Sequence, residues 1–303
     1  MQSQRHTTIG LGEVLWDLLP GGRQLGGAPA NFAYFANLLG ERGIVASRVG
    51  DDELGREASA RVRQLGSSIE FLQCDPDHPT GIVQVRVDAG GQPQFDIAQP
   101  VAWDFLQWTA GWKELAEEAD AVCFGSLAQR SPASRRTILQ FLRATRPETL
   151  RVFDVNLRQP FYSAEVVAES LPLAQIIKLN HDELPVMTRL LGATFTGERT
   201  AAEMLLRRHR ARLVCVTRGS CGSLLVSEQG AVEHPGFRVP VADTVGAGDA
   251  FTATLVHYYL CGASPHEMNE AANRVGAWVA SQVGATPVPA SGNLQLALAA
   301  LKA

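Results

Sequence analysis

Short apolar segments alternate with amphipathic segments along most of the chain. The amphipathic segments place apolar residues three and four positions apart, which is the spacing of a helix face. The predicted strands are Thr7–Gly12, Val14–Leu19, Ile44–Val49, Ala121–Phe124, Arg151–Asp154, Ile176–Leu179 and Leu213–Thr217. The predicted helices are Pro29–Leu39, Leu54–Leu65, Ser131–Arg146, Ser163–Leu171, Asp182–Leu191 and Glu198–Arg210. Because near-continuous apolar strands separated by helices are covered on both faces, the pattern predicts an α/β protein with a mainly parallel sheet.

One region departs from this alternation of strands and helices. Gly81–Asp88 and Gln92–Ile97 alternate apolar and polar residues, and Ala89–Gly91 between them is a hairpin turn signal. We interpret the hairpin as a small accessory sheet that pairs with the strand at Val14–Leu19. The alternative is an extension at the edge of the main sheet.

Nothing in the sequence divides the chain into separate units. It has no internal repeat, low-complexity tract or linker rich in proline and serine. Its 303 residues are 46% hydrophobic and 19% charged, so there is ample material for a core and no signature of disorder. We expect one domain over residues 1–303, carrying a lid inserted from about 13–24 and 79–100.

Charge and cysteine usage exclude several classes of protein. The net charge of −4 argues against a broad nucleic-acid surface and against binding to anionic membranes, but it leaves room for a small phosphate-binding cleft. No apolar run is long enough for a transmembrane helix, and the first residues lack the sections of a signal peptide. The five scattered cysteines contain no C-x-x-C, which predicts free thiols in a reducing cytosol rather than disulfides or a zinc site.

The segment Asp243–Asp249, Asp-Thr-Val-Gly-Ala-Gly-Asp, carries the strongest chemical signal. Apolar residues at 251, 255, 258 and 259 predict a helix that begins near Asp249. Two glycines before a helix expose backbone N–H groups, which form an anion site together with the positive end of the helix dipole. A carboxylate there could take a proton from a hydroxyl that attacks a phosphate. The alternative is that Asp249 only caps the helix.

Other known nucleotide-binding and metal-binding motifs are absent from the sequence or incomplete in it. The chain has no P-loop and no protein-kinase signature. Gly10-Leu11-Gly12 opens like a dinucleotide-binding fingerprint, but Leu15 stands where glycine or alanine is required. His266–Glu270 lacks the second histidine of a zinc protease.

Five motifs in order resemble the ribokinase-like (pfkB) family of carbohydrate kinases over essentially the whole chain. They are Gly12–Asp17 with Leu25–Asn31, Asp154–Arg158, Asn180–Glu183, Thr217–Gly219 and Asp243–Asp249. The resemblance implies a three-layer α/β fold with a small β-sheet lid and transfer of a phosphoryl group from ATP to a sugar hydroxyl. It also implies that Asp249 is the catalytic base and that Gly246, Ala247 and Gly248 form the anion hole.

The sugar site implied by the resemblance lies near the N-terminus. Asp17 and Asn31 would bind sugar hydroxyls, while Gly26 and Gly27 would let the backbone approach the ring. Taken alone, Asn31 is equally a polar residue of a first helical turn, and the two glycines are equally a plain loop. Further candidates are Gln129 or Arg130, which follow a buried strand, Arg158 at the sugar–phosphate region, and the aromatic walls Trp16 and Phe32.

The resemblance also implies nucleotide and metal sites. Asn180 and Glu183 would organise Mg²⁺ through water together with the phosphates, and Mg²⁺ suits so sparse a set of carboxylates. Thr217 and Gly219 would contact the nucleotide at a strand end. Asn273 would approach adenine or, alternatively, face solvent. A K⁺ site would use Asp243 and Val245 with the later loop, through Val279, Gln282 and Gly284, although Val288 offers no side-chain ligand.

The identity of the acceptor rests on resemblance more than on physics. Gly26–Asn31 with Gly12–Asp17 is most similar to the bacterial fructokinases, so D-fructose is the expected substrate. The alternatives are a kinase for ribose, 2-keto-3-deoxygluconate or a nucleoside, and a non-catalytic sugar or nucleotide sensor on the same fold. We expect a cytoplasmic enzyme acting on small molecules only, with no nucleic-acid or membrane partner, and a homodimer formed through the lid.

Overall fold

The large sheet forms the centre of the computed structural model, which describes residues 5–19, 21–87, 93–158 and 160–289, together with Leu294 and Leu298. Within these residues the sheet has nine strands. In spatial order they are β13 (Gly230–His234), β12 (Ser223–Ser227), β11 (Leu213–Thr217), β10 (Ile176–Asn180), β9 (Leu150–Asp154), β8 (Ala121–Phe124), β1 (Thr7–Leu11), β4 (Arg42–Gly50) and β5 (Leu72–Asp75). In this spatial order, every pair of neighbouring strands between β11 and β5 is parallel. β12 pairs antiparallel with β11, and β13 pairs antiparallel with β12. The predicted mainly parallel sheet is confirmed, and β5, β12 and β13 extend it beyond the predicted strands.

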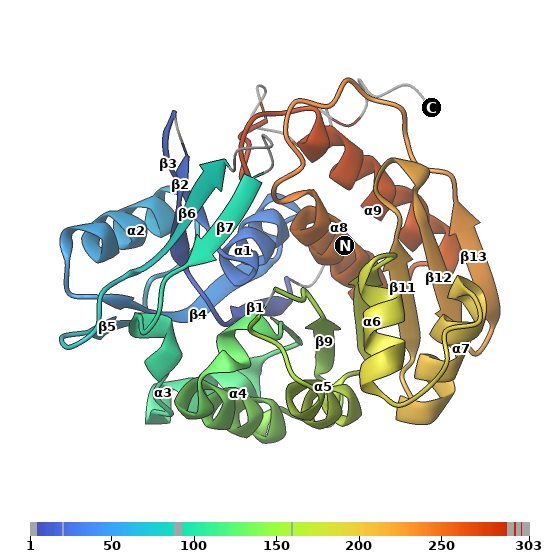
Figure 1. The fold of residues 1–303 in the computed structure, drawn as a ribbon, viewed down its shortest axis with the longest axis horizontal. Coiled ribbons are helices and arrows are strands. Elements are labelled where there is room, and N and C mark those ends of the chain that lie inside the picture. Colours follow the sequence, from blue (N-terminus) through green and yellow to red (C-terminus); the bar gives the residue numbers. More distant parts are fainter. Residues whose placement is uncertain are drawn as a thin grey trace.

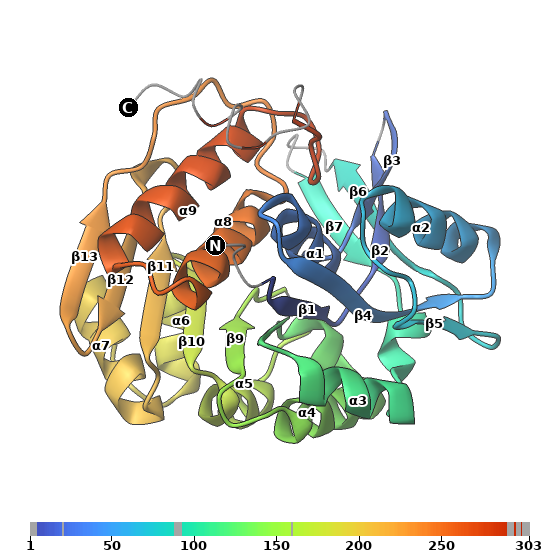
Figure 2. The same ribbon diagram turned by 180° about the vertical axis from the view of Figure 1, so that it is seen from behind.

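Helices cover both faces of the large sheet (Figures 1 and 2). One layer consists of α1 (Ala28–Leu38), α2 (Glu53–Gln64), α8 (Ala247–Leu260) and α9 (Pro265–Ala280). The other consists of α3 (Ala110–Glu118), α4 (Pro132–Ala144), α5 (Ala164–Ser170), α6 (Glu183–Leu190) and α7 (Glu198–His209). Short 3₁₀ turns lie at Ala102–Phe105, Leu127–Arg130, Leu171–Leu173 and Gly219–Cys221.

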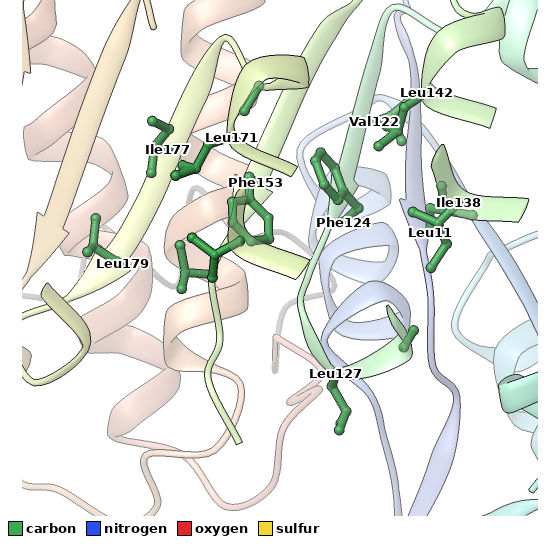
Figure 3. Packing of buried hydrophobic residues seen from close by; sticks show 14 of the residues in the cluster. Leu11, Val122, Phe124, Leu127, Ile138, Leu142, Phe153, Leu171, Ile177 and Leu179 are labelled. Atoms are coloured by element: carbon green, nitrogen blue, oxygen red, sulfur yellow. The ribbon is translucent and has the colours of Figure 1, made fainter. Parts of the chain in front are cut away.

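Strand alternation explains why the sheet needs two helical layers. Successive side chains of a strand point to opposite faces. On β8, Val122 and Phe124 therefore pack against the layer that contains α4, whereas Ala121 and Cys123 pack in the cluster of α1, α8 and α9. Figure 3 shows Phe124 and Phe153 side by side in the first of these clusters; their rings are stacked at 5.1 Å. Burial on both faces is what the near-continuous apolar strands require.

A second, four-stranded sheet lies beside α1 and α2 (Figure 1). Its order is β3 (Gly22–Gly26), β2 (Leu15–Leu19), β6 (Gly81–Val87) and β7 (Pro93–Ile97). The predicted hairpin forms as β6 and β7, and it pairs in parallel with β2, so the alternative of an extension to the main sheet is wrong. Trp16 on β2 donates its indole N–H to the Leu54 carbonyl of α2 at 2.9 Å, which joins this sheet to the main body. The turn at Ala89–Gly91 lies outside the described residues.

Among the described residues, no helix is both long and apolar enough to span a membrane.

Candidate active site

The candidate chemistry gathers at the carboxyl ends of the parallel strands. Glu13 lies two residues after β1 ends, while Asp154 ends β9 and Asn180 ends β10. The strand register places Asp154 beside Lys178 and Asn180 beside Thr217. Open α/β sheets bind ligands at this edge because the connecting loops there leave a crevice. The fold therefore brings together motifs that lie far apart in the sequence.

The glycine-rich segment forms a tight turn at the start of α8. Gly246 is the N-cap residue, with φ of 80°, and a Cβ added there would lie 2.3 Å from the carbonyl oxygen of Ala285. A residue without a side chain is therefore required at this position. The helix begins at Ala247, so Asp249 stands in its first turn and not at the cap. The alternative that Asp249 only caps the helix is wrong.

Asp249 is instead hydrogen-bonded to the N-terminal motif. Asn31 Nδ2 donates to Asp249 Oδ2 at 2.7 Å, across 218 positions of sequence. Asn31 lies in the first turn of α1 and is only 4% exposed. The two candidate signatures thus form one site, in which the residue expected to bind sugar touches the residue expected to act as base.

A buried ion pair lies beneath Asp249. Lys178 Nζ contacts Asp154 Oδ1 at 3.1 Å, and the hydroxyl of Thr252 on α8 lies 2.9 Å from Asp154 Oδ2. Burial lowers the pKa of Lys178, but the carboxylates of Asp154, Glu183 and Asp249 outweigh this effect and keep the lysine charged. Burial, followed by the negative charge of Asp154, raises the pKa of Asp249 to about 6. A base with a pKa near the working pH is suited to proton transfer.

Glu13 is a site residue that the sequence reasoning did not single out. It is 3% exposed and lines a small pocket together with Asp154 and Asp249. Its Oε2 has no hydrogen-bond partner among the described residues. Burial is the main cause that raises its pKa to about 7, and the charge of Asp249 adds to it. The available signal was a lone acid between the apolar residues Leu11 and Val14.

Replacing Glu13 by glutamine should stabilise the fold at alkaline pH. A carboxyl whose pKa is raised by folding contributes stability below its unfolded value of 4.5, and that contribution is lost as the pH rises through about 7. At pH 8 the variant should exceed the wild type by on the order of 3 kcal/mol in free energy of unfolding. Urea titrations at pH 4.5 and pH 8 measure this difference. A difference that does not grow with pH would contradict the assignment.

Asp17 faces this region from the small sheet. Burial raises its pKa to about 6, while Arg158 opposes the shift. A Cβ on Gly26 would lie 2.3 Å from Asp17 Oδ2, and one on Gly27, whose φ is 106°, would lie 2.4 Å from the carbonyl oxygen of Glu13. Close approach to backbone therefore requires glycine at position 27, whereas a side chain at position 26 would displace the Asp17 carboxylate, and both contacts correct the reading of a plain loop. Arg158 is exposed and lowers the pKa values of Glu13, Asp17 and Asp249, so it supplies positive charge to this region.

Gln129 corrects a sequence expectation. It is 1% exposed; its amide nitrogen donates to the carbonyl of Gly125 and to Ser170, and its oxygen accepts from Ser170. These bonds use the amide within the protein, so Gln129 is not placed to reach a sugar hydroxyl. The neighbouring Arg130 is bound to both oxygens of Asp104 and lies over the ring of Trp103 at 3.9 Å.

Glu183 is buried and accepts two backbone hydrogen bonds. Its Oε1 accepts from Leu157 and its Oε2 from Asn180, each at 2.8 Å, so it ties the loop after β9 to the end of β10. The side-chain oxygen of Asn180 accepts in turn from the N–H groups of Asp182 and Glu183. Taken alone, Glu183 would be a solvated carboxylate of a first helical turn, and its burial shows that this alternative is wrong.

Asn273 is buried, so the reading that it faces solvent is wrong. It is 7% exposed, and its amide nitrogen donates to Ser223 of β12 and to Asn269 of α9. It is therefore neither solvent-facing nor able to offer this nitrogen to an adenine ring. Gly219, with φ of 57°, and Thr217 lie at the end of β11.

The segments expected to hold K⁺ lie together. Asp243 Oδ1 accepts from the N–H of Val245 at 3.0 Å, and Oδ2 accepts from the N–H of Gly284 at 3.1 Å. Val279 belongs to α9, and its carbonyl accepts from the N–H of Gln282 at 2.9 Å. Asp243 thus bridges the loop before α8 and the loop after α9.

Known proteins resemble this chain along most of its length. A model of the pfkB family of carbohydrate kinases matches residues 21–291. Fructokinase from Escherichia coli is 32% identical over 267 residues, which are 81% of this chain and 82% of that protein. Aminoimidazole riboside kinase from Salmonella typhimurium is 31% identical over 241 residues, 76% of this chain and 72% of that protein.

Solved structures agree with this relationship. A crystal structure of fructokinase from Vibrio cholerae, with fructose, ADP and calcium bound, has a TM-score of 0.81 and 26% identity, and the match covers 99% of this chain and 100% of that chain. The expected three-layer α/β fold with its small second sheet is confirmed. The family model spans most of the sequence, and both curated relatives exceed 30% identity. The chain belongs to the pfkB family of carbohydrate kinases.

Proposed function

We propose that this kinase transfers the γ-phosphoryl group of ATP to a hydroxyl of D-fructose, with Asp249 as the base. The observation that carries the proposal is the hydrogen bond from Asn31 to Asp249. A sugar held by Asn31 has its hydroxyl beside the one carboxylate at the start of α8. Because the pKa of Asp249 lies near 6, the carboxylate is ionised at neutral pH and still basic enough to receive a proton.

The reaction needs few further parts. Asp249 removes the proton of the sugar hydroxyl, whose oxygen attacks the γ-phosphorus while the bond to the ADP oxygen breaks. The N–H groups of Gly246 and Gly248 offset the charge that grows on the transferred group. The N–H of Ala247, which donates to the Thr244 carbonyl at 3.3 Å, joins them when that long bond gives way to a phosphate oxygen. Asp17 and Gly26 hold the sugar from the small sheet. This sheet is inserted from about 13–24 and 79–100, and it acts as a lid that excludes water from the sugar. Pro29, Phe32 and Phe124 give the pocket an apolar wall.

Magnesium and potassium fit the residues at this edge. Among the residues that the structure describes, each oxygen of Glu183 accepts one hydrogen bond and retains a lone pair for a metal-bound water. Mg²⁺ held in this way would neutralise phosphate charge when bound. Asp243, with the carbonyl groups of the loops that it bridges, would hold K⁺ beside the anion hole.

A panel of acceptors tests the proposed substrate. D-Fructose should give a higher kcat/KM than ribose, 2-keto-3-deoxygluconate, adenosine or aminoimidazole riboside, because buried polar groups left unpaired by the wrong sugar weaken its transition state. ADP release is measured at saturating ATP with Mg²⁺ and K⁺ present. The similarity to aminoimidazole riboside kinase makes that riboside the sharpest competitor. A higher value for any of the four would overturn the fructose assignment and leave the kinase assignment standing.

Replacing Glu183 by glutamine should raise the Mg²⁺ concentration needed for half-maximal activity. Glutamine removes one negative charge from the edge that holds the metal's water shell, and it offers one acceptor oxygen in place of two. A Mg²⁺ titration of activity at fixed ATP measures the effect. Asp182→Asn removes an adjacent, exposed carboxylate and is the matched control. Identical titrations for Glu183→Gln and wild type would remove Glu183 from the metal network.

A further inference from the structure

A cluster of metal-ligating side chains lies at the opposite end of α8 from Asp249. Glu41, between α1 and β4, meets His257 in the last turn of α8 and Cys261 at its C-cap. Their ligand atoms all lie within 4.8 Å of one another, and among the described residues this is the one such group of three. His6, just before β1, also contacts Glu41.

The carboxylate of Glu41 orients the histidine. His257 Nδ1 lies 2.6 Å from Glu41 Oε1, and the backbone N–H of His6 donates to Oε2, also at 2.6 Å. Both carboxylate oxygens of Glu41 thus lie within hydrogen-bond distance of a nitrogen atom. An ionised carboxylate accepts the Nδ1 proton. In the neutral imidazole the lone pair therefore lies on Nε2.

The Nε2 atom of His257 lies near a thiol. His257 Nε2 lies 4.0 Å from Cys261 Sγ, and the two residues are four positions apart, on one face of the helix end. Zinc binds sulfur at about 2.3 Å and imidazole nitrogen at about 2.0 Å, which at a tetrahedral angle separates the two ligand atoms by about 3.5 Å. A small rotation of the exposed cysteine side chain closes the difference.

The three side chains of the cluster differ in solvent exposure in a way that suits a metal site. The side chain of Glu41 is 4% exposed, that of His257 is 23% exposed, and Cys261 is exposed. The orienting carboxylate is thus buried, while the side chains of the two ligands are partly open to solvent, from which an ion and its waters can enter. A carboxylate that accepts from the non-ligating nitrogen of a histidine is the usual outer support of a bound zinc ion.

We propose that His257 Nε2 and Cys261 Sγ bind a divalent transition-metal ion of the zinc class, with Glu41 orienting the imidazole and water completing the coordination. Binding displaces the thiol proton to solvent, so affinity rises with pH. This site is separate from the pocket that holds Asp249, and the proposal does not rest on fructose or on any other acceptor. The absence of a C-x-x-C motif does not argue against this metal site. The two ligands, His257 and Cys261, are four positions apart on a helix, and the orienting Glu41 comes from a distant segment of the chain.

Cobalt titration of the 303-residue chain, freed of metal with a chelator, tests the proposal. Co²⁺ should bind with one equivalent per chain and give the near-ultraviolet thiolate-to-cobalt band. Cys261→Ser should abolish the band, and His257→Gln should weaken binding at least tenfold. Cys221→Ser, which alters another exposed thiol, is the matched control and should leave the titration unchanged.

The role of Glu41 in orienting His257 is tested separately, by the cobalt affinity of a Glu41 variant. Glu41→Gln should weaken cobalt binding about 10- to 100-fold while the one-equivalent stoichiometry remains. If this buried substitution prevents folding, the variants at the two ligands still decide the matter. A wild-type protein without the band, or a band that survives in Cys261→Ser, would overturn the proposal. Kinase activity should be the same in Cys261→Ser and wild type, which keeps the result distinct from any failure of the proposed function.

Discussion

Replacing Asp249 by asparagine should lower kcat at least ~10²-fold, the lower range for loss of a general base. Asparagine keeps an oxygen that can accept the hydrogen bond from Asn31, so the geometry that joins α1 to α8 is retained. It cannot take the hydroxyl proton. Sugar and ATP affinities should stay within a few-fold of wild type, because the loss falls on a step that follows binding.

Stability separates this loss from unfolding. The pKa of Asp249 is raised by burial, so removing its charge should leave the melting temperature at pH 8 unchanged or higher. Asp182→Asn, at an exposed carboxylate near the same edge of the sheet, is the control and should keep full turnover. A folded Asp249→Asn protein with the kcat of wild type would show that Asp249 is not the base and serves only as a hydrogen-bond partner of Asn31.

Replacing Gly246 by alanine should also reduce kcat by about 10² to 10³-fold, the range for losing one donor of an anion hole. The added Cβ would lie 2.3 Å from the carbonyl oxygen of Ala285, and that oxygen belongs to backbone. The turn must therefore move, which misdirects the N–H groups at the start of α8. Initial rates at saturating ATP and sugar measure the loss.

Gly262→Ala is a matched control for this substitution. Gly262 follows the same helix and has φ of 75°, close to the 80° of Gly246, but a Cβ there meets nothing within 4 Å. It carries the left-handed backbone cost of about 1–2 kcal/mol without the clash. Equal kcat values for the two variants would mean that backbone strain, and not the position of the anion hole, governs the effect.

The periodicity of the sequence was enough to predict most of the central elements. β8 and β11 have the predicted bounds, and α4, α6 and α7 lie within one or two residues of theirs. These elements are buried along one stripe or on both faces, so their apolar spacing reflects the core directly. The strands β12 and β13 were not predicted. β13 is the edge strand, mostly half-buried or exposed, and its pattern is correspondingly weak.

Side-chain direction could not be predicted from the sequence. Gln129 and Asn273 stand near strand ends and helix faces where a ligand contact was reasonable, yet both amides are used inside the protein. Glu13 was not singled out from the sequence, yet it lines the pocket beside Asp249. An amide or carboxyl takes whatever partners the packing brings near it, and those partners lie far away in the sequence.

The sequence by itself determined the α/β class, the glycine-rich turn before α8 and the family, because these depend on local spacing and on residues that lie together in short motifs. Only the tertiary structure decided that Asn31 meets Asp249, that Glu183 ties two loops together and that Glu41 meets His257 and Cys261. Each of these contacts joins segments that are brought together when the parallel strands align their ends and the helices pack across them. Long-range pairing is set by the packing of the whole core, which no local pattern encodes.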